Sequence, residues 1–143
     1  EEYLDRGYGQ CFLSRRQVAE IVRDSLLKFV GMRYLLFAWV IMPNHIHLLL
    51  RPQPGFKLEK IIHSFKSFTA QESNRVLGRE GKFWMREAFD RYIRDSDHFN
   101  RAFRYIKNNP VKAGFCATPE EWEFSSAWER RHPAGTPVSD EEA

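Results

Sequence analysis

The sequence predicts an α+β domain in which helices cover one face of an antiparallel sheet, as in ferredoxin-like or RRM-like proteins. Two observations indicate this class. Segments with helical periodicity alternate with aromatic, β-branched segments, and a single short turn separates the two strongest strand segments. The order of elements expected from this sequence is α-β-β-α-β-α, whereas a ferredoxin-like or RRM-like domain has the order β-α-β-β-α-β. Residues 1–13 contain Gly7 and Gly9 and lack a strand pattern, so we expect the first strand to be missing from this chain.

The first helix is predicted over residues 14–31. Ser14 and Gln17 have the spacing of a capping box, in which the serine side chain caps the first turn. Gly31 supplies the stop, because glycine readily takes the backbone conformation that ends a helix. The apolar stripe at helical spacing consists of Val18, Ile21, Val22, Leu26 and Phe29.

A hairpin and a second helix are predicted next. Residues 32–42 and 45–52 are apolar and rich in aromatic and branched side chains, and Pro43–Asn44 between them suits a tight turn. We expect the two strands to pair in antiparallel fashion. Residues 57–78 then show a helical stripe that ends at a glycine.

A third strand and a third helix complete the expected order. Residues 82–95 are rich in aromatic side chains and predict a strand with a bend. Residues 96–110 predict a helix that Asp95 or Ser96 caps. Pro110 is expected to end this helix, because proline lacks the amide hydrogen that continues the ladder.

The composition is that of a folded domain. Hydrophobic residues make up 43% of the chain and aromatic residues 15%, which excludes a disordered protein. No apolar run approaches the roughly 20 residues that span a bilayer, and no signal peptide opens the chain. Cys11 and Cys116 lack the spacing of a metal site or a disulfide framework, which favours a reducing, cytoplasmic setting. We expect residues 1–131 to form one domain and residues 132–143 to form an acidic, disordered tail.

Basic charge is concentrated in the middle of the chain. Residues 51–116 hold 14 Lys or Arg against 7 Asp or Glu, whereas residues 117–143 hold 2 against 7. A basic surface that contacts only solvent would show the same excess of basic residues. However, eight of the 14 are Arg, whose planar guanidinium matches phosphate geometry. The excess therefore favours a nucleic-acid partner. The candidate DNA-binding residues are Lys66, Arg75, Arg91, Arg94, Arg101, Arg104, Lys107 and Lys112.

His45 and His47 form an H-x-H pair at the start of the second predicted strand. Residues i and i+2 of a strand share a face, so the two imidazoles can meet one cation. A metal site needs at least a third ligand from elsewhere. A hydrogen-bonded pair of structural histidines has the same sequence, and the pair alone leaves both interpretations open.

The third predicted helix carries the candidate nucleophile. Tyr105 and Asn109 lie one turn apart on the flank of its apolar stripe. A tyrosine there can present its hydroxyl to a phosphate, although tyrosines at the edge of a core are common because the side chain is amphipathic. Tyr92 ranks behind Tyr105, because its strand-like segment gives the side chain a sheet face to fill. His63 and His98 are interpreted as structural or solvent-facing.

Two motifs together resemble those of single-tyrosine HUH transposases. "MPNHIHLLL" resembles the HUH motif (His, hydrophobic, His), and "YIKNNPVKAG" resembles the catalytic helix. The segments "FWMREAFDRYIRDSDHF" and "WEFSSA" resemble the REP-associated tyrosine transposase branch. The resemblance covers about residues 3–130 and is specific because both motifs occur at this separation. It implies the HUH endonuclease fold.

The resemblance also implies roles for four residues. His45 and His47 would bind a divalent ion, Mg²⁺ or Mn²⁺, and Asn109 stands where related enzymes place a Gln that completes the metal site. Tyr105 would attack a phosphate of single-stranded or hairpin DNA of the REP type, leaving a 5′-phosphotyrosine and a free 3′-hydroxyl. In relatives the tyrosine helix can come from a partner subunit, so a homodimer is a further implication.

Three other functions fit parts of the sequence. Histidine-triad phosphohydrolases need H-x-H-x-H, and Leu49 occupies the third position, which disfavours them. An RRM-like nucleic-acid-binding module would make the histidines incidental and does not account for Tyr105 with Asn109. A domesticated transposase would bind its DNA hairpin without cutting it.

Overall fold

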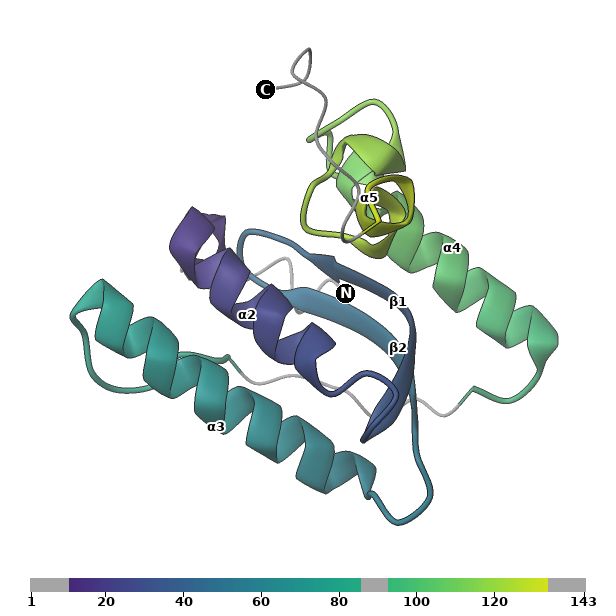
Figure 1. The fold of residues 1–143 in the computed structure, drawn as a ribbon. Helices are drawn as coiled ribbons and strands as arrows, with labels where there is room; N and C mark the ends of the chain where they lie inside the picture. The colour runs from purple at the N-terminus through teal and green to yellow at the C-terminus, as the bar shows by residue number, and fades with distance from the viewer. Residues whose placement is uncertain (1–10, 86–92, 134–143) are drawn as a thin grey trace.

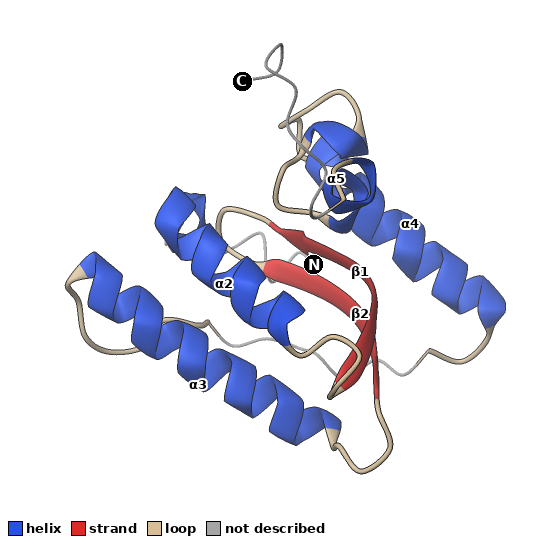
Figure 2. Cartoon of the chain, viewed as in Figure 1, coloured by secondary structure: helices blue, strands red, loops and turns tan. Residues whose placement is uncertain are grey.

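The computed structural model describes residues 11–85 and 93–133, and the structural statements below concern these residues. The elements are η1 (Phe12–Ser14), α2 (Arg16–Lys28), β1 (Tyr34–Ile41), β2 (Ile46–Pro52), α3 (Leu58–Leu77), α4 (Ser96–Lys112), η2 (Pro119–Glu121) and α5 (Ser126–Arg131). Figure 2 shows the resulting mixture of helices and one two-stranded sheet. None of the described helices is both long enough and apolar enough to cross a membrane.

The strand predicted at residues 82–95 is not found where it can be checked. Residues 82–85 and 93–95 have no strand geometry, and the middle of the predicted strand, residues 86–92 with Tyr92, lies outside the described residues. The sequence pattern was aromatic but did not alternate, and alternation is what distinguishes a half-buried strand from an aromatic loop. Phe83 and Trp84 are instead packed against the core from this loop.

The predicted hairpin is confirmed. β1 pairs with β2 in antiparallel fashion, with Trp39 opposite Leu48 and Val40 opposite His47. The amide of Met42 donates to the carbonyl of His45 at 2.8 Å, which closes the turn over Pro43–Asn44. At its other edge, β1 is bonded to the C-terminal segment, where the Ile41 amide donates to the Phe124 carbonyl at 2.9 Å.

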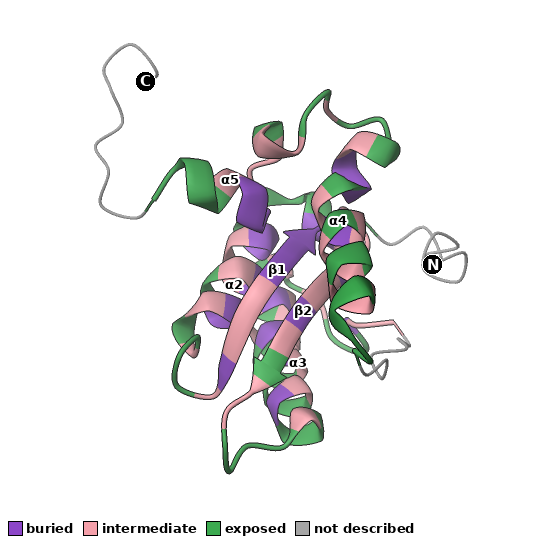
Figure 3. Cartoon of the chain, turned by 90° about the vertical axis from the view of Figure 1, so that its right-hand side faces the viewer, coloured by how far each residue is buried: buried purple, intermediate pink, exposed green. Residues whose placement is uncertain are grey.

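The sheet separates two cores, as Figure 1 shows by the placement of α2 and α3 on one face and α4 on the other. Figure 3 views the sheet from the α4 side, with α2 and α3 behind it, and shows buried positions along β1. The sequence predicted helices on one face of the sheet only, and the structure corrects this: α2 and α3 lie on one face, and α4 packs on the opposite face through its own apolar stripe. The core under α2 and α3 includes Val22, Leu26, Trp39, Ile41, Ile46 and Phe65. The core under α4 consists of Ala38, Val40, Met42, Leu49 and Ile106.

The helix boundaries predicted at Gly78 and Asp95 are confirmed. Gly78 ends α3 in the left-handed conformation, with φ 66°, and Asp95 caps α4 by accepting a hydrogen bond from the His98 amide at 2.8 Å. The capping box at Ser14 was wrong: α2 begins at Arg16 after Arg15. Ser14 belongs to the preceding 3₁₀ turn and donates its hydroxyl to the Cys11 carbonyl at 2.6 Å, so its side chain is not available as a cap.

The prediction that Pro110 ends α4 was also wrong, because the helix continues to Lys112. Proline removes one amide from the helical ladder, but the Ala113 amide still donates to the Asn109 carbonyl at 3.0 Å. The missing bond therefore affects one position near the helix end, which the last turn tolerates. The extra residues matter because they carry a lysine to the candidate site.

Candidate active site

The two histidines lie on the sheet face that α4 covers. Ile46 and Leu48 pack toward α2 and α3, whereas Leu49 packs toward α4. Because side chains alternate along a strand, His45 and His47 project toward α4 with Leu49. Their ring centroids are 4.8 Å apart with the planes at 80°, and His45 is 6% exposed.

His45 is oriented by its neighbour Asn44. The ring nitrogen Nδ1 lies 2.7 Å from the Asn44 side-chain oxygen Oδ1. An amide oxygen can only accept, so Nδ1 must carry the hydrogen and donate it. The lone pair of the neutral ring is then on Nε2, which is the arrangement of an imidazole prepared to bind a metal ion.

Tyr105 contacts the histidine pair within one chain. Its ring centroid is 5.3 Å from that of His47, and the planes meet at 78°. The Tyr105 hydroxyl and the His47 Nε2 atom are both buried. The docking of the tyrosine helix beside the histidine strand, on which the prediction of a cutting site depended, is therefore present without a second subunit.

A pocket of about 390 Å³ opens between the hairpin turn and the end of α4. His45 and Asn109 both line it, and Asn109 is 6% exposed. His47 and Tyr105 are not among the lining residues; the ring contact between His47 and His45 connects them to the pocket. The four residues predicted to act together thus occupy one region of the molecule.

The donor chemistry of this region fits a divalent cation. Among the described residues, no cluster of three or more His, Cys, Asp or Glu side chains is present. A metal ion here would therefore rest on the two imidazoles and the amide oxygen of Asn109. These three donors are neutral, so a bound ion would keep its charge for an anionic ligand.

The predicted basic residues fall into two groups. Along α4, at about 100° per residue, Arg101, Tyr105 and Lys112 lie within about 40° of one another, and Lys107 is on the opposite flank. The Lys112 ammonium is 5.9 Å from the centre of the Tyr105 ring and lines the pocket. We call this side of α4, with Arg101 and Lys112, the basic stripe.

The other basic residues lie elsewhere. Arg94 and Arg104 are exposed on or just before α4. Lys66 and Arg75 are on α3, across the sheet from the pocket, and Arg75 is paired with Glu72 at 2.9 Å. Arg91 lies outside the described residues.

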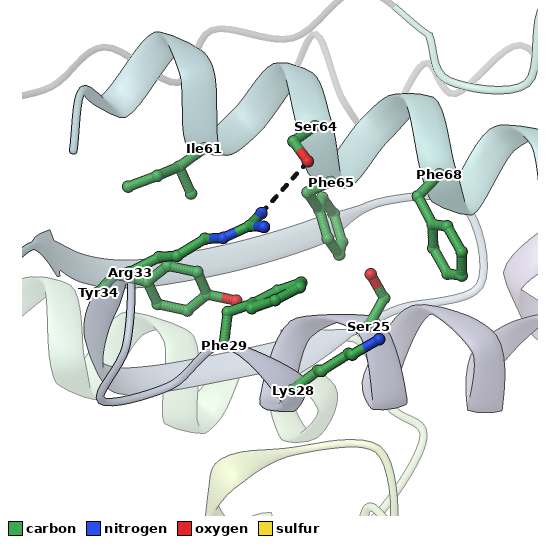
Figure 4. A pocket seen from close by; sticks show the side chains of 9 residues that line it. All are labelled: Ser25, Lys28, Phe29, Arg33, Tyr34, Ile61, Ser64, Phe65 and Phe68. Carbon is green, nitrogen blue, oxygen red and sulfur yellow. Dashed lines mark hydrogen bonds between the residues drawn. The ribbon is translucent and has the colours of Figure 1, made fainter.

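A second, smaller pocket of about 140 Å³ lies between α2 and α3, on the other face of the sheet. Figure 4 shows that Arg33 extends across it. The guanidinium lies 3.6 Å above the ring centre of Phe29 and donates to the Ser64 hydroxyl at 3.4 Å. Burial raises the pKa of Tyr34, whose hydroxyl donates to the Leu26 carbonyl. This pocket is bridged by its own side chains and contains no histidine, so it is not the candidate active site.

Two contributors to the site were not predicted from the sequence. Asn44 was interpreted only as a turn residue, although its position directly before the first histidine of "PNHIH" was a usable signal. Phe115 lines the pocket from beyond the end of α4.

Comparisons with known proteins identify relatives of this chain. A family model described as "Transposase IS200 like" matches residues 14–109, a range that includes both histidines, Tyr105 and Asn109. The chain is 32% identical over 96 residues to a Haemophilus influenzae protein named as a REP-associated tyrosine transposase. That match covers 60% of this chain and 54% of the relative, so the chain spans about half the length of the curated relative it matches.

The fold is shared with a solved structure. A REP-associated tyrosine transposase bound to a REP hairpin superposes with a TM-score of 0.68 over 94% of this chain and 80% of the other, at 19% identity. This similarity confirms the predicted α+β class and the HUH endonuclease fold. The family match and the shared fold together show that this chain belongs to the IS200-like transposase family.

Proposed function

We propose that this protein is a DNA transposase that cuts and rejoins one strand of hairpin DNA with Tyr105 as the nucleophile. The observation that carries the proposal is the contact of Tyr105 with His47 in the same chain, beside a pocket that His45 and Asn109 line. A tyrosine that only packs at the edge of a core would not need two histidines and a buried asparagine close by. A phenol in contact with two imidazoles, beside a pocket that a buried amide lines, supplies the groups that metal-assisted strand cleavage would use.

Tyr105 would form the covalent intermediate. Its phenolic oxygen attacks the scissile phosphorus, a Tyr105–phosphorus bond forms, and the bond from phosphorus to the 3′ oxygen breaks. The phenol loses its proton and the departing 3′ oxygen gains one, which leaves a 5′-phosphotyrosine and a free 3′-hydroxyl. Because the new bond is again a phosphodiester, the reverse attack by a 3′-hydroxyl can rejoin DNA without a nucleotide cofactor. Division of one displacement into two is the general logic of covalent catalysis.

His45, His47 and Asn109 would hold a divalent cation, Mg²⁺ or Mn²⁺. When bound, such an ion supplies charge that polarises a phosphate and stabilises the negative charge that develops in its displacement. Asn44 keeps His45 in the tautomer with a free lone pair on Nε2. His47 and Asn109 supply the other two donors from opposite sides of the sheet–helix junction.

The Tyr105 hydroxyl is buried in the free protein. A free tyrosine has a pKa near 10, so it is mostly protonated and weakly nucleophilic at neutral pH. Entry of a DNA strand into the pocket would have to bring a phosphate against the buried hydroxyl. A flexible single strand can do this, whereas a duplex backbone cannot wrap closely around a side chain on a helix.

The basic stripe of α4 would bind the DNA backbone on the way to the pocket. Arg101 and Lys112 flank Tyr105 on the same side of the helix, about 16 Å apart along its axis, so phosphates a few nucleotides apart on one strand could contact both. Arg94 and Arg104 would add contacts around the helix. Lys66 and Arg75 would bind DNA only if it also reached α3, across the sheet.

The substrate class follows from the relatives. The structural neighbour was solved with a REP hairpin, and we propose that this chain likewise acts on an imperfect DNA hairpin with a single-stranded flank. A homodimer remains a prediction. The four residues of the candidate site lie in one region of a single chain, so the site does not require a second subunit.

The test is an assay for a covalent adduct. The protein is incubated with end-labelled hairpin DNA and Mn²⁺ and then run on a denaturing gel, where a protein–DNA adduct migrates slowly. We expect an adduct with the wild type and none with Tyr105→Phe, which removes only the hydroxyl. His45→Ala should abolish the adduct but keep hairpin binding in a native gel. An adduct that survives Tyr105→Phe would refute the assignment of the nucleophile, and binding without any wild-type adduct would favour a domesticated protein that no longer cuts.

A further inference from the structure

Phe115 is a half-exposed aromatic side chain at the edge of the candidate active site. It is 50% exposed, and it lines the same pocket as His45 and Asn109. Single exposed apolar residues are ordinary on protein surfaces. What distinguishes Phe115 is that the fold holds both its backbone and its ring in place.

The backbone of Phe115 is fixed by the motif that ends α4. The Phe115 amide donates to the Pro110 carbonyl and the Gly114 amide donates to the Val111 carbonyl, both at 3.0 Å. Gly114 has φ 82°, a left-handed conformation that suits glycine. This pair of bonds is the Schellman motif, and it places the residue after the glycine at a defined position beside the helix end.

The ring of Phe115 is fixed by Trp122. The two rings stack with centroids 5.3 Å apart and planes at 21°. Trp122 is itself anchored to the sheet, because its indole nitrogen Nε1 donates to the Ile41 carbonyl at 3.0 Å. One face of the phenylalanine ring is therefore covered by the indole, and its exposed surface is presented on a rigid support.

The charge around Phe115 favours an anionic aromatic ligand. Lys112 lies three residues earlier, is exposed, and lines the same pocket. None of the described residues that line the pocket is acidic. A planar apolar surface next to a cation, in a pocket without carboxylates, matches one unit of single-stranded DNA, which has a flat base and a phosphate.

We propose that Phe115 is a stacking site for the unpaired base next to the scissile phosphate, with Lys112 binding that nucleotide's phosphate. This inference rests on the proposed function and specifies its substrate: the cleaved nucleotide must be unpaired. Stacking on an aromatic side chain needs a free base face, and a base inside a duplex has both faces covered by its neighbours. Phe115 would thus direct cleavage to the single-stranded flank of a hairpin and away from its stem.

Binding is measured in the Tyr105→Phe background, so that no covalent product forms. The probe is a DNA hairpin with a single-stranded flank in which one unpaired base at a time is replaced by 2-aminopurine, whose fluorescence falls when it stacks. We expect strong quenching at one flank position. Phe115→Leu keeps an apolar contact with Trp122 but removes the aromatic face, and should relieve the quenching. It should also weaken binding by about five-fold or more, the lower end of base–aromatic stacking.

The controls separate stacking from general effects. Phe115→Trp should retain affinity and quenching, because it restores an aromatic face. Phe68→Leu makes the same change at an equally exposed phenylalanine, 51% exposed, on α3 across the sheet. It should leave binding within two-fold, about 0.4 kcal/mol.

Three results would overturn the inference. The first is that Phe115→Leu binds the hairpin as tightly as the parent protein. The second is that Phe115→Leu and Phe68→Leu lose the same DNA affinity. The third is that Phe115→Leu has a lower melting temperature but an unchanged affinity. The last would mean that the ring only packs within the protein. Because the measurement uses binding alone, it can fail while the wild type still forms its Tyr105 adduct, and it can succeed if the adduct is absent.

Discussion

Replacement of Asn44 by alanine should weaken metal binding although Asn44 is not a proposed ligand. Asn44 accepts a hydrogen bond from His45 Nδ1 at 2.7 Å, and His45 is 6% exposed, so little water is available to replace the lost acceptor. Without it, the hydrogen can move to Nε2, where it blocks the lone pair, or the ring can rotate. We therefore expect His45 to spend much of its time in states that cannot bind a cation.

These contacts set the size of the effect. A neutral hydrogen bond contributes about 1 kcal/mol net to stability, so unfolding should become easier by about that amount. Loss of the partner that orients a metal-binding histidine typically lowers metal affinity by about 10- to 100-fold, which is about 1.4 to 2.7 kcal/mol. Metal affinity should therefore fall by at least as much free energy as the fold loses.

Mn²⁺ binding to the Tyr105→Phe protein can be followed by electron paramagnetic resonance, which detects free Mn²⁺ and does not need activity. Asn44→Asp keeps an acceptor for the His45 hydrogen and should bind Mn²⁺ at least as tightly as the parent. Asn108→Ala changes an exposed asparagine of α4 and should have no effect. If Asn44→Ala folds normally and binds Mn²⁺ as tightly as the parent, the assignment of the His45 tautomer is wrong.

Three further predictions concern other parts of the molecule. Arg101→Ala should weaken hairpin binding and reduce its salt dependence more than Lys107→Ala, measured by fluorescence anisotropy over a salt series, because only Arg101 shares the side of α4 that carries Tyr105; equal effects would refute the basic stripe. Thr69→Val should lower the free energy of unfolding by about 1 to 3 kcal/mol in urea titrations, because the fully buried Thr69 hydroxyl donates to a backbone carbonyl and accepts from an indole; an unchanged midpoint would contradict this. A bulky maleimide on the exposed Cys11, which lines the pocket, should block adduct formation, and Cys11→Ser should resist the reagent. Burial, with a further contribution from a nearby glutamate, raises the pKa of Cys116, so it should react more slowly in the same mass-spectrometric assay; loss of activity in labelled Cys11→Ser would show that another site matters.

Local sequence patterns determined most of the elements. The hairpin followed from two apolar segments around Pro43–Asn44. The C-terminal end of α3 followed from Gly78, and the start of α4 followed from Asp95. These features depend on turn chemistry and capping, which involve residues close together in the chain. The sequence predictions failed where a local signal competed with its surroundings. Ser14 forms part of a 3₁₀ turn and does not cap α2, and Pro110 lies within the last turns of α4 without ending the helix.

The sequence by itself determined which chemical groups the site contains, but only the tertiary structure decided how they meet. The spacing of His45 and His47 fixed their shared face, because side chains alternate along a strand. Nothing local fixed which layer that face would contact. The packing of α4 against that face of the sheet, through Ile106 and Leu49, brings Tyr105 to His47 across 58 residues of sequence. Burial of apolar surface is not directional, so the sequence does not specify which helix covers which face of the sheet. Only the assembled core pairs α4 with the face that carries the histidines.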